Sequence, residues 1–355
     1  MKKVFDIHAH YLFPIKIEKQ VEILKKEMDV TGTEKICFLS IPNDVRDERY
    51  HLDYTQNVKA LFLKHSFGQN GYAFAGLEHP LNSQEVSKEF LSENFYKQAV
   101  EYYENGFDGM KMLEGYPSVR KHDKIALDDE VYDKYYEFLE LNQIPVIMHL
   151  ANPQENWDIK KADKYAIEQG RVYDSSYPTK DQLEREMFGI LKKHRRLKLG
   201  LAHFGFMSYD IKMAERFLSY ENTFFDITPG GEQLINMSKS WDNWGQFFQK
   251  YQDRIVYGTD YYAFPDENEV EWEICFTRRP NLIRQLFETD QEYDYLDSHF
   301  KGVSLDETII DKIYSQNALK ILGCRKDINY SYLIEKALGT LSKNIKHVKY
   351  LDDDM

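Results

Sequence analysis

The sequence predicts an α/β protein of the (β/α)8 barrel class. Eight short apolar segments with strand character alternate with segments of helical spacing along the 355 residues. The apolar segments are nearly continuous, as expected for parallel strands that helices cover on the outside. A count of eight favours a closed barrel in one domain, for which 42% hydrophobic residues supply an ample core. An open doubly wound sheet with a separate C-terminal domain is the alternative.

The first four strands follow one another closely. The first begins almost at residue 1, and Pro42 closes the second. The third helix stops at Gly106, because glycine suits the position just after a helix. We expect strands in this half at residues 4–10, 36–41, 72–77 and 109–113, separated by helices at residues 14–33, 53–67 and 89–105.

The second half is more loosely spaced. Long polar segments at residues 151–181 and 261–303 interrupt the alternation, and Pro145 stands at a strand start, where a missing N–H is tolerated. We expect strands at residues 144–150, 197–204, 223–228 and 254–260, and helices at residues 131–141, 182–194, 211–218 and 306–322. We assign residues 1–326 to a single barrel domain and residues 327–355 to a C-terminal helical extension, with a helix over 330–345.

Histidines and an aspartate stand at the ends of several predicted strands. His8 and His10 lie two positions apart on the first strand and therefore face the same side. His149 ends the fifth strand, His203 the sixth and Asp260 the eighth. Barrel enzymes assemble their sites at these C-terminal strand ends, and neutral imidazole is the commonest metal ligand. The pattern predicts a His/Asp cluster at the barrel mouth, with satisfied core histidines as the alternative.

Two further residues belong to the same end of the predicted barrel. Lys111 ends the fourth strand, and a lysine among imidazoles and a carboxylate is not a typical surface lysine. Tyr261 directly follows Asp260. We interpret both as candidate substrate-binding residues. The alternatives are a lysine that packs against Asp260 or Glu114, and a tyrosine that packs a long loop.

Charge and composition exclude several classes of partner. The formal net charge is −13, so no basic surface is expected for nucleic acid or an anionic membrane. No run reaches the 18 or more apolar residues of a membrane span, and the three cysteines are too widely spaced for a disulfide framework or zinc knuckle. We expect a cytoplasmic protein that acts on a small-molecule substrate. Aromatic residues in segment 261–303 make a homodimer plausible.

The residues at the strand ends resemble those of the amidohydrolase superfamily of metal-dependent TIM-barrel enzymes. The resemblance extends over residues 4–323 and is strongest toward the aminocarboxymuconate-semialdehyde decarboxylase-like branch. It rests on Asp6-Ile-His8-Ala-His10, Gly109-Met-Lys111, Met148-His149, Ala202-His203-Phe-Gly205, Tyr257-Gly-Thr-Asp260 and Ser315-Gln-Asn317. Each segment is weak evidence alone, but the ordered set is specific.

The resemblance implies a role for each matched residue. His8, His10, His149 and Asp260 would bind one Zn²⁺ or a similar divalent ion such as Mn²⁺. Asp260 would also take a proton from water, and His203 would act beside the ion as an acid, a base or a group that polarises the substrate. A carboxylated Lys111 bridging two ions is the alternative to a single ion.

The function expected from this resemblance is hydrolysis. A metal-activated water would cleave a C–N or C–O bond of a small carbonyl-bearing substrate. The alternative is a metal-dependent non-oxidative decarboxylase of a small unsaturated or aromatic carboxylic acid, which would use the same residues. A binding protein that keeps the barrel without catalysis is a third reading.

Overall fold

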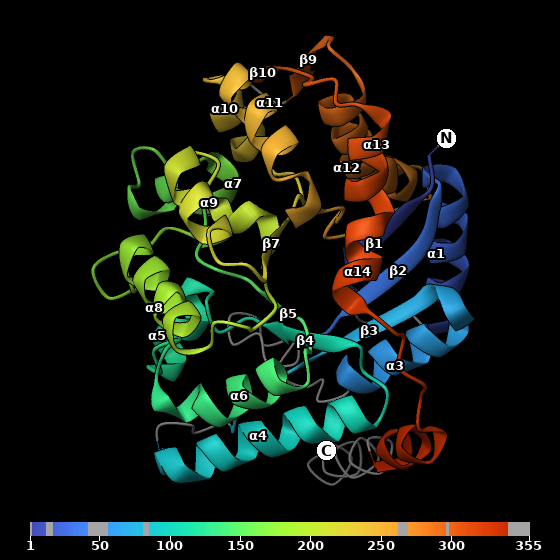
Figure 1. Cartoon of the computed structure of the whole chain (residues 1–355), viewed down its shortest axis with the longest axis vertical. Coiled ribbons are helices and arrows are strands. Elements are labelled where there is room, and N and C mark those ends of the chain that lie inside the picture. Colours follow the sequence, from blue (N-terminus) through green and yellow to red (C-terminus); the bar gives the residue numbers. More distant parts are fainter. Residues whose placement is uncertain are drawn as a thin grey trace, which may run out of the picture.

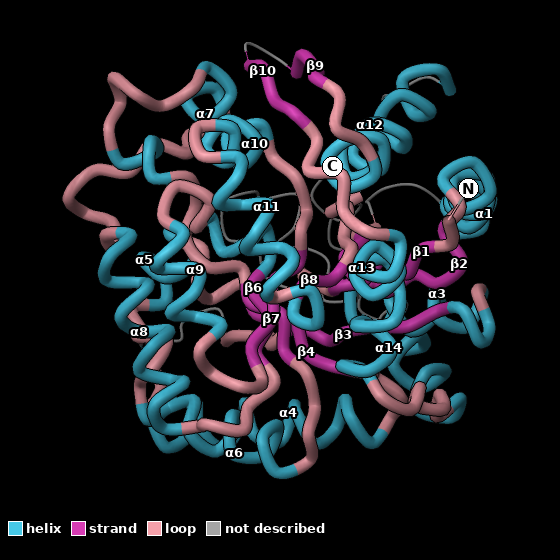
Figure 2. The backbone as a smooth tube through the Cα atoms, turned by 45° about the horizontal axis from the view of Figure 1, so that its top comes forward, coloured by secondary structure: helices cyan, strands magenta, loops and turns pink. Residues whose placement is uncertain are grey.

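Eight parallel strands, paired in chain order, form a nearly closed barrel with helices around it (Figures 1 and 2). The computed structural model describes residues 2–11, 17–41, 56–80, 85–261, 269–295 and 298–339. The strands pair in chain order: β1 (Val4–Ala9), β2 (Thr33–Leu39), β3 (Gly71–Gly76), β4 (Gly109–Met112), β5 (Val146–Met148), β6 (Leu199–Leu201), β7 (Thr223–Asp226) and β8 (Ile255–Val256). The fold predicted from the sequence is confirmed.

Backbone hydrogen bonds between β1 and the residues after β8 close the barrel. Ile7 N–H donates to the Tyr257 carbonyl at 3.1 Å, and His10 N–H donates to the Tyr261 carbonyl at 2.7 Å. Ala9 and Tyr261 form a parallel bridge. Tyr261, predicted as a substrate-binding residue, therefore has a structural role in its backbone, and its side chain is 5% exposed.

Helices surround the strands in both views (Figures 1 and 2). The side chains of Ser87, Thr179 and Asp210 accept backbone N–H groups and so cap the helices that begin at residues 88, 180 and 211. The helices are α1 (Ile17–Thr31), α3 (Gln56–Ser66), α4 (Lys88–Glu104), α5 (Pro117–Asp123), α6 (Asp133–Leu141), α7 (Lys164–Glu168), α8 (Lys180–Lys193), α9 (Ile211–Leu218), α10 (Gly231–Ser238), α11 (Trp241–Lys250), α12 (Glu269–Glu288), α13 (Glu307–Asp311) and α14 (Asn317–Leu322).

Several details differ from the prediction. The segments expected to be loops contain the short helices α5 and α7, the long helix α12 and a hairpin of β9 (Glu292–Tyr295) and β10 (Ser298–Lys301). The final helix is divided by a π-helical turn over Lys312–Gln316. The predicted sixth and eighth strands are too long, because His203, Phe204 and Asp260 have φ angles of 54°, 55° and 51° and so turn the chain away from the sheet.

Alternate strand residues face two different hydrophobic clusters. On β3, Ala73 and Ala75 pack with the helices, whereas Tyr72 and Phe74 belong to a smaller cluster supplied mainly by the strands. This smaller cluster fills the barrel interior. Glycine is required at Gly109 on β4, because a Cβ there would lie 2.5 Å from the Phe74 ring. Aromatic rings on one strand thus occupy the space that a glycine leaves on the next.

A buried ion pair joins α3 to β4. Lys64 Nζ lies 2.7 Å from Asp108 Oδ2, and the two side chains are 0% and 1% exposed. Lys64 also donates to the Gly106 carbonyl, while Asp108 accepts the backbone N–H groups of Ala73 and Lys326. The pair therefore connects the strands with the chain that follows α14.

The chain beyond the barrel forms a helix over residues 330–339, drawn in red in Figure 1. Tyr332 and Lys336 on this helix bind Glu101 of α4, at 2.9 Å and 2.7 Å. The remainder of the predicted helix over 330–345 lies outside the described residues. The domain boundary at residue 326 stays a prediction.

Candidate metal centre

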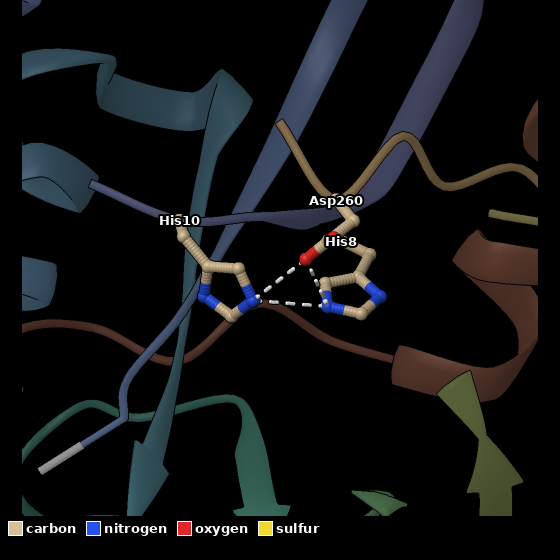
Figure 3. Close-up of side chains that lie close together, drawn as sticks. All are labelled: His8, His10 and Asp260. Carbon is tan, nitrogen blue, oxygen red and sulfur yellow. Dashed lines mark hydrogen bonds and ion pairs between the residues drawn. The ribbon is translucent and has the colours of Figure 1, made fainter. Parts of the chain in front are cut away.

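His8, His10 and Asp260 bring three ligand atoms together at the barrel mouth, and Figure 3 shows their polar ends facing one another. The Nε2 atoms of the two histidines are 3.1 Å apart. Asp260 Oδ1 lies 3.1 Å from His10 Nε2 and 3.4 Å from His8 Nε2. Among the described residues this is the one group of three His, Cys, Asp or Glu side chains whose ligand atoms all lie within 4.8 Å of one another.

Both imidazoles are held at their far nitrogen. His8 Nδ1 lies 2.5 Å from Asp226 Oδ2, and His10 Nδ1 lies 2.7 Å from the Leu39 carbonyl. An acceptor at Nδ1 places the ring proton there and leaves the lone pair of Nε2 for an ion. Two imidazole nitrogens and a carboxylate are a donor set that suits Zn²⁺ and Mn²⁺, so these residues fit the ion implied by the sequence.

The protonation states also suit an ion. Burial and the charge of Lys111 lower the pKa of His8 to about 4, which keeps the imidazole neutral. Burial acts to raise the pKa of Asp260, but His203 and the Arg279 guanidinium outweigh it and hold that pKa well below its usual value. Arg279 Nη1 lies 3.1 Å from Asp260 Oδ2, so the other carboxylate oxygen is the one that faces the histidines.

Lys111 is buried beside this centre. The residue is 2% exposed, and its Nζ has no hydrogen-bond partner among the described residues. Burial lowers the pKa of Lys111 to about 8, against the opposing effect of the carboxylates of Asp226, Asp260 and Glu114. Lys111 is therefore mostly charged at pH 7 and has the capacity to bind an anionic group.

The other two predicted histidines lie next to each other. The rings of His149 and His203 are 5.0 Å apart, and the His203 ring is 5.2 Å from that of His8. Burial lowers the pKa of His203 to about 3, so its imidazole is neutral. His149 Nε2 is 3.0 Å from the Ala151 carbonyl, and ligation through Nε2 would exchange this hydrogen bond for the ion. His149 as a metal ligand stays a prediction.

Asp226 on β7 is a residue that the sequence reasoning missed. It is fully buried and contacts His8 across the barrel. Its signal in the sequence is a carboxylate near the end of the predicted strand at residues 223–228. A terminal aspartate on that strand could have been grouped with the histidines on this basis.

A second polar cluster lies at the same end of the barrel. His79, which follows β3, has Nε2 at 2.9 Å from Glu114 Oε1 and Nδ1 at 3.5 Å from Asp123 Oδ2. Burial alone would lower the pKa of His79, but the hydrogen bond to Glu114 and the charge of Asp123 raise it above its usual value. The cluster joins the loops that follow β3 and β4 to the end of α5.

We predict that His79→Gln makes the protein less stable at pH 6 than at pH 9, relative to wild type. The folded-state pKa of His79 exceeds the unfolded value of about 6.5, so the imidazolium stabilises the fold below pH 6.5. This contribution disappears as the pH rises through the folded-state pKa. A charge-assisted hydrogen bond contributes about 1.5–3 kcal/mol, which is the expected loss at pH 6. Urea unfolding at both pH values measures it.

The exposed His299 supplies the control for this prediction. Its side chain is 58% exposed, so His299→Gln should change the free energy of unfolding by less than about 0.5 kcal/mol at either pH. An equal loss of stability for His79→Gln at pH 6 and pH 9 would contradict the assignment of an imidazolium to His79.

A closed eight-stranded barrel with histidines and an aspartate gathered at its mouth defines a class of metal-dependent barrel enzymes. The sequence profile of the amidohydrolase family matches residues 92–324. The chain belongs to this family, as the strand-end residues indicated. No curated protein sequence matches the chain.

Solved structures share the fold at low sequence identity. An uncharacterised TIM-barrel protein from Bordetella bronchiseptica has a TM-score of 0.57 at 12% identity, over 90% of this chain and 98% of that one. A probable 2-pyrone-4,6-dicarboxylic acid hydrolase from Acinetobacter baumannii, with citric acid bound, has a TM-score of 0.53 at 11% identity, over 91% and 100%. A dihydroxybenzoic acid decarboxylase from Polaromonas, with bound manganese and the inhibitor 2-nitroresorcinol, has a TM-score of 0.51 at 14% identity, over 91% and 97%.

Within the part of the chain that the structure describes, no helix has both the length and the apolar character needed to cross a membrane.

Proposed function

We propose that the protein is a metal-dependent hydrolase that cleaves a C–N or C–O bond of a small substrate bearing a carbonyl and a carboxylate. His8, His10 and Asp260 would hold one divalent ion, Zn²⁺ or Mn²⁺, with His149 as a fourth ligand. The convergence of the three ligand atoms within 4.8 Å is the observation that supports this proposal most directly. The homodimer and the cytoplasmic location expected from the sequence stay predictions.

The chain's own residues divide the work around the ion. When bound, a divalent ion supplies Lewis acidity and brings the pKa of a water molecule toward about 7. Asp260 would be the carboxylate placed to take a proton from such a water, and its ion pair with Arg279 would make it a weak base. His203 is neutral and lies 5.2 Å, ring to ring, from His8, which suits its N–H to polarise a substrate carbonyl by hydrogen bonding. The proton that the leaving group needs would come from the one taken up by Asp260.

Lys111 supports a carboxylated substrate. A buried ammonium without a hydrogen-bond partner is costly unless a ligand completes it, and a carboxylate is the complementary group. This observation also favours the second candidate function, a non-oxidative decarboxylase. Its carboxylate would be the group lost as CO2, and His203 or Asp260 would handle the proton. One similar barrel is a probable hydrolase of a dicarboxylic acid and another is a decarboxylase, so the fold alone does not decide between the two reactions.

A substrate screen tests the proposal. The purified protein, reconstituted with Zn²⁺ or Mn²⁺, is incubated with lactones, amides and esters of small carboxylic acids and with aromatic carboxylic acids. Mass spectrometry detects either a ring-opened product whose mass is that of the substrate plus one water, or two fragments whose masses sum to that value. A coupled assay detects CO2. Hydrolysis without CO2 release is the expected result. Release of CO2 without addition of water would contradict the hydrolase function and support the decarboxylase function.

We predict that Lys111→Met weakens binding of a small carboxylate about 10- to 100-fold, since a hydrogen bond to a charged group contributes about 1.5–3 kcal/mol. Titration calorimetry with benzoate as the probe measures the loss. Benzamide, the neutral isostere, is the control ligand and should bind both proteins alike. Equal affinity of the two proteins for benzoate would show that Lys111 does not bind the carboxylate.

A further inference from the structure

Asp226 receives hydrogen bonds from three parts of the barrel mouth. Its Oδ2 lies 2.5 Å from His8 Nδ1, and both side chains are 0% exposed. Its Oδ1 accepts the backbone N–H of Thr228 at 2.9 Å, that of His203 at 3.3 Å, and the Thr228 hydroxyl. A carboxylate with this many donors is fixed in orientation, because rotating it would leave several buried N–H groups unpaired.

The backbone of the chain after β8 packs closely against the pair. Gly258, which follows β8, faces the pair. A Cβ at this glycine would lie 3.0 Å from His8 Cβ and 3.3 Å from Asp226 Cγ. His8 is therefore confined between β7 and β8, with its Nδ1 edge directed at the carboxylate. Its opposite edge, Nε2, is the one that faces His10 and Asp260.

We propose that Asp226 is the positioning residue of the metal centre. It holds the His8 ring proton on Nδ1, which keeps the Nε2 lone pair directed toward the ion, and its bond to the His203 backbone holds that residue in its left-handed turn beside the ion. The expected effect on metal binding rests on the proposed function. The position of the His8 ring proton, in contrast, can be measured in the metal-free protein. Asp226 does not bind the ion in this arrangement.

The exchange Asp226→Asn tests the proposal sharply because it changes few atoms. The Asn carbonyl oxygen can still accept from Thr228 and His203, and its NH2 group then faces His8 Nδ1. A donor there requires His8 Nδ1 to become the acceptor, so the ring proton moves to Nε2 and blocks ligation. We expect Zn²⁺ affinity, measured by competition with a chromophoric chelator, to fall about 10- to 100-fold.

A second readout requires no metal. In the metal-free wild-type protein, ¹⁵N NMR of the His8 ring should show the proton on Nδ1, and in Asp226→Asn it should show the proton on Nε2. Thr228→Val is a graded variant, because it removes a hydroxyl that contacts both Asp226 Oδ1 and His8 Nδ1 but retains the carboxylate. It should keep the Nδ1 proton and change Zn²⁺ affinity less than about threefold. Asp210→Asn, at the cap of α9, is the control for an Asp-to-Asn exchange elsewhere.

The outcomes separate this proposal from the metal function. If wild type binds no metal, the proposed function fails, while the ring-proton measurement still tests Asp226. If wild type binds metal and Asp226→Asn binds it equally well with the His8 proton on Nδ1, the positioning role of Asp226 is wrong. Should Asp226→Asn fail to fold, Asp226→Ser, which removes the carboxylate and leaves room for water, is measured in its place by the same two readouts.

Discussion

Replacing His8 and His10 together by alanine should remove the bound metal and all metal-dependent activity. The two imidazoles supply two of the three ligand atoms that lie together at the barrel mouth. If four ligands share a binding free energy on the order of 12 kcal/mol, losing two costs on the order of 6 kcal/mol, or about 10⁴-fold in affinity. Elemental analysis after dialysis against a weak chelator measures the loss, with wild type treated in parallel.

The control for this experiment is a histidine away from the centre. His299→Ala changes an exposed residue of the hairpin and should leave the metal content as in wild type. The double variant should retain its circular dichroism spectrum, since the barrel strands are held by their backbone pairing. A double variant that keeps a full equivalent of tightly bound metal would place the site elsewhere.

Lys64→Met should lower the free energy of unfolding by about 3–5 kcal/mol. The substitution leaves the Asp108 carboxylate buried without its counter-charge, and removing one partner of a buried ion pair has this cost. Asp108 keeps its two backbone donors, which holds the loss near the lower end of the range. Chemical denaturation monitored by tryptophan fluorescence measures the change.

An exposed lysine on the next helix supplies the control. Lys97 of α4 has a side chain that is 70% exposed, so Lys97→Met should change stability by less than about 0.5 kcal/mol. A loss below about 1 kcal/mol for Lys64→Met would mean that water reaches Asp108 when the lysine is absent.

The barrel could be predicted because its strands are buried on both faces. Continuous apolar segments such as residues 72–77 and 144–150 can be recognised as buried strands without knowing what they contact. Strand ends were less predictable. Residues 202–204 look apolar, yet His203 and Phe204 adopt positive φ angles that only the surrounding structure explains. Helix α12 was missed because Pro280 lies inside it and its apolar spacing is irregular.

The site was predictable only in part, for a different reason. His8 and His10 share a strand, so their common side follows from spacing, and their proximity to Asp260 follows from barrel closure. Asp226 is 218 residues from His8 along the chain, and its contact depends on side-chain direction across the barrel interior. Arg279 reaches Asp260 from a helix that the sequence did not predict. Contacts of this kind arise from tertiary packing and leave little local signal.

The metal content of the purified wild-type protein tests the central claim most directly. Elemental analysis after reconstitution with Zn²⁺ or Mn²⁺ and removal of excess ion should find one divalent ion per chain. Two ions per chain would indicate a carboxylated Lys111 that bridges them. No bound ion under any reconstitution condition would contradict the assignment of His8, His10 and Asp260 as a metal centre.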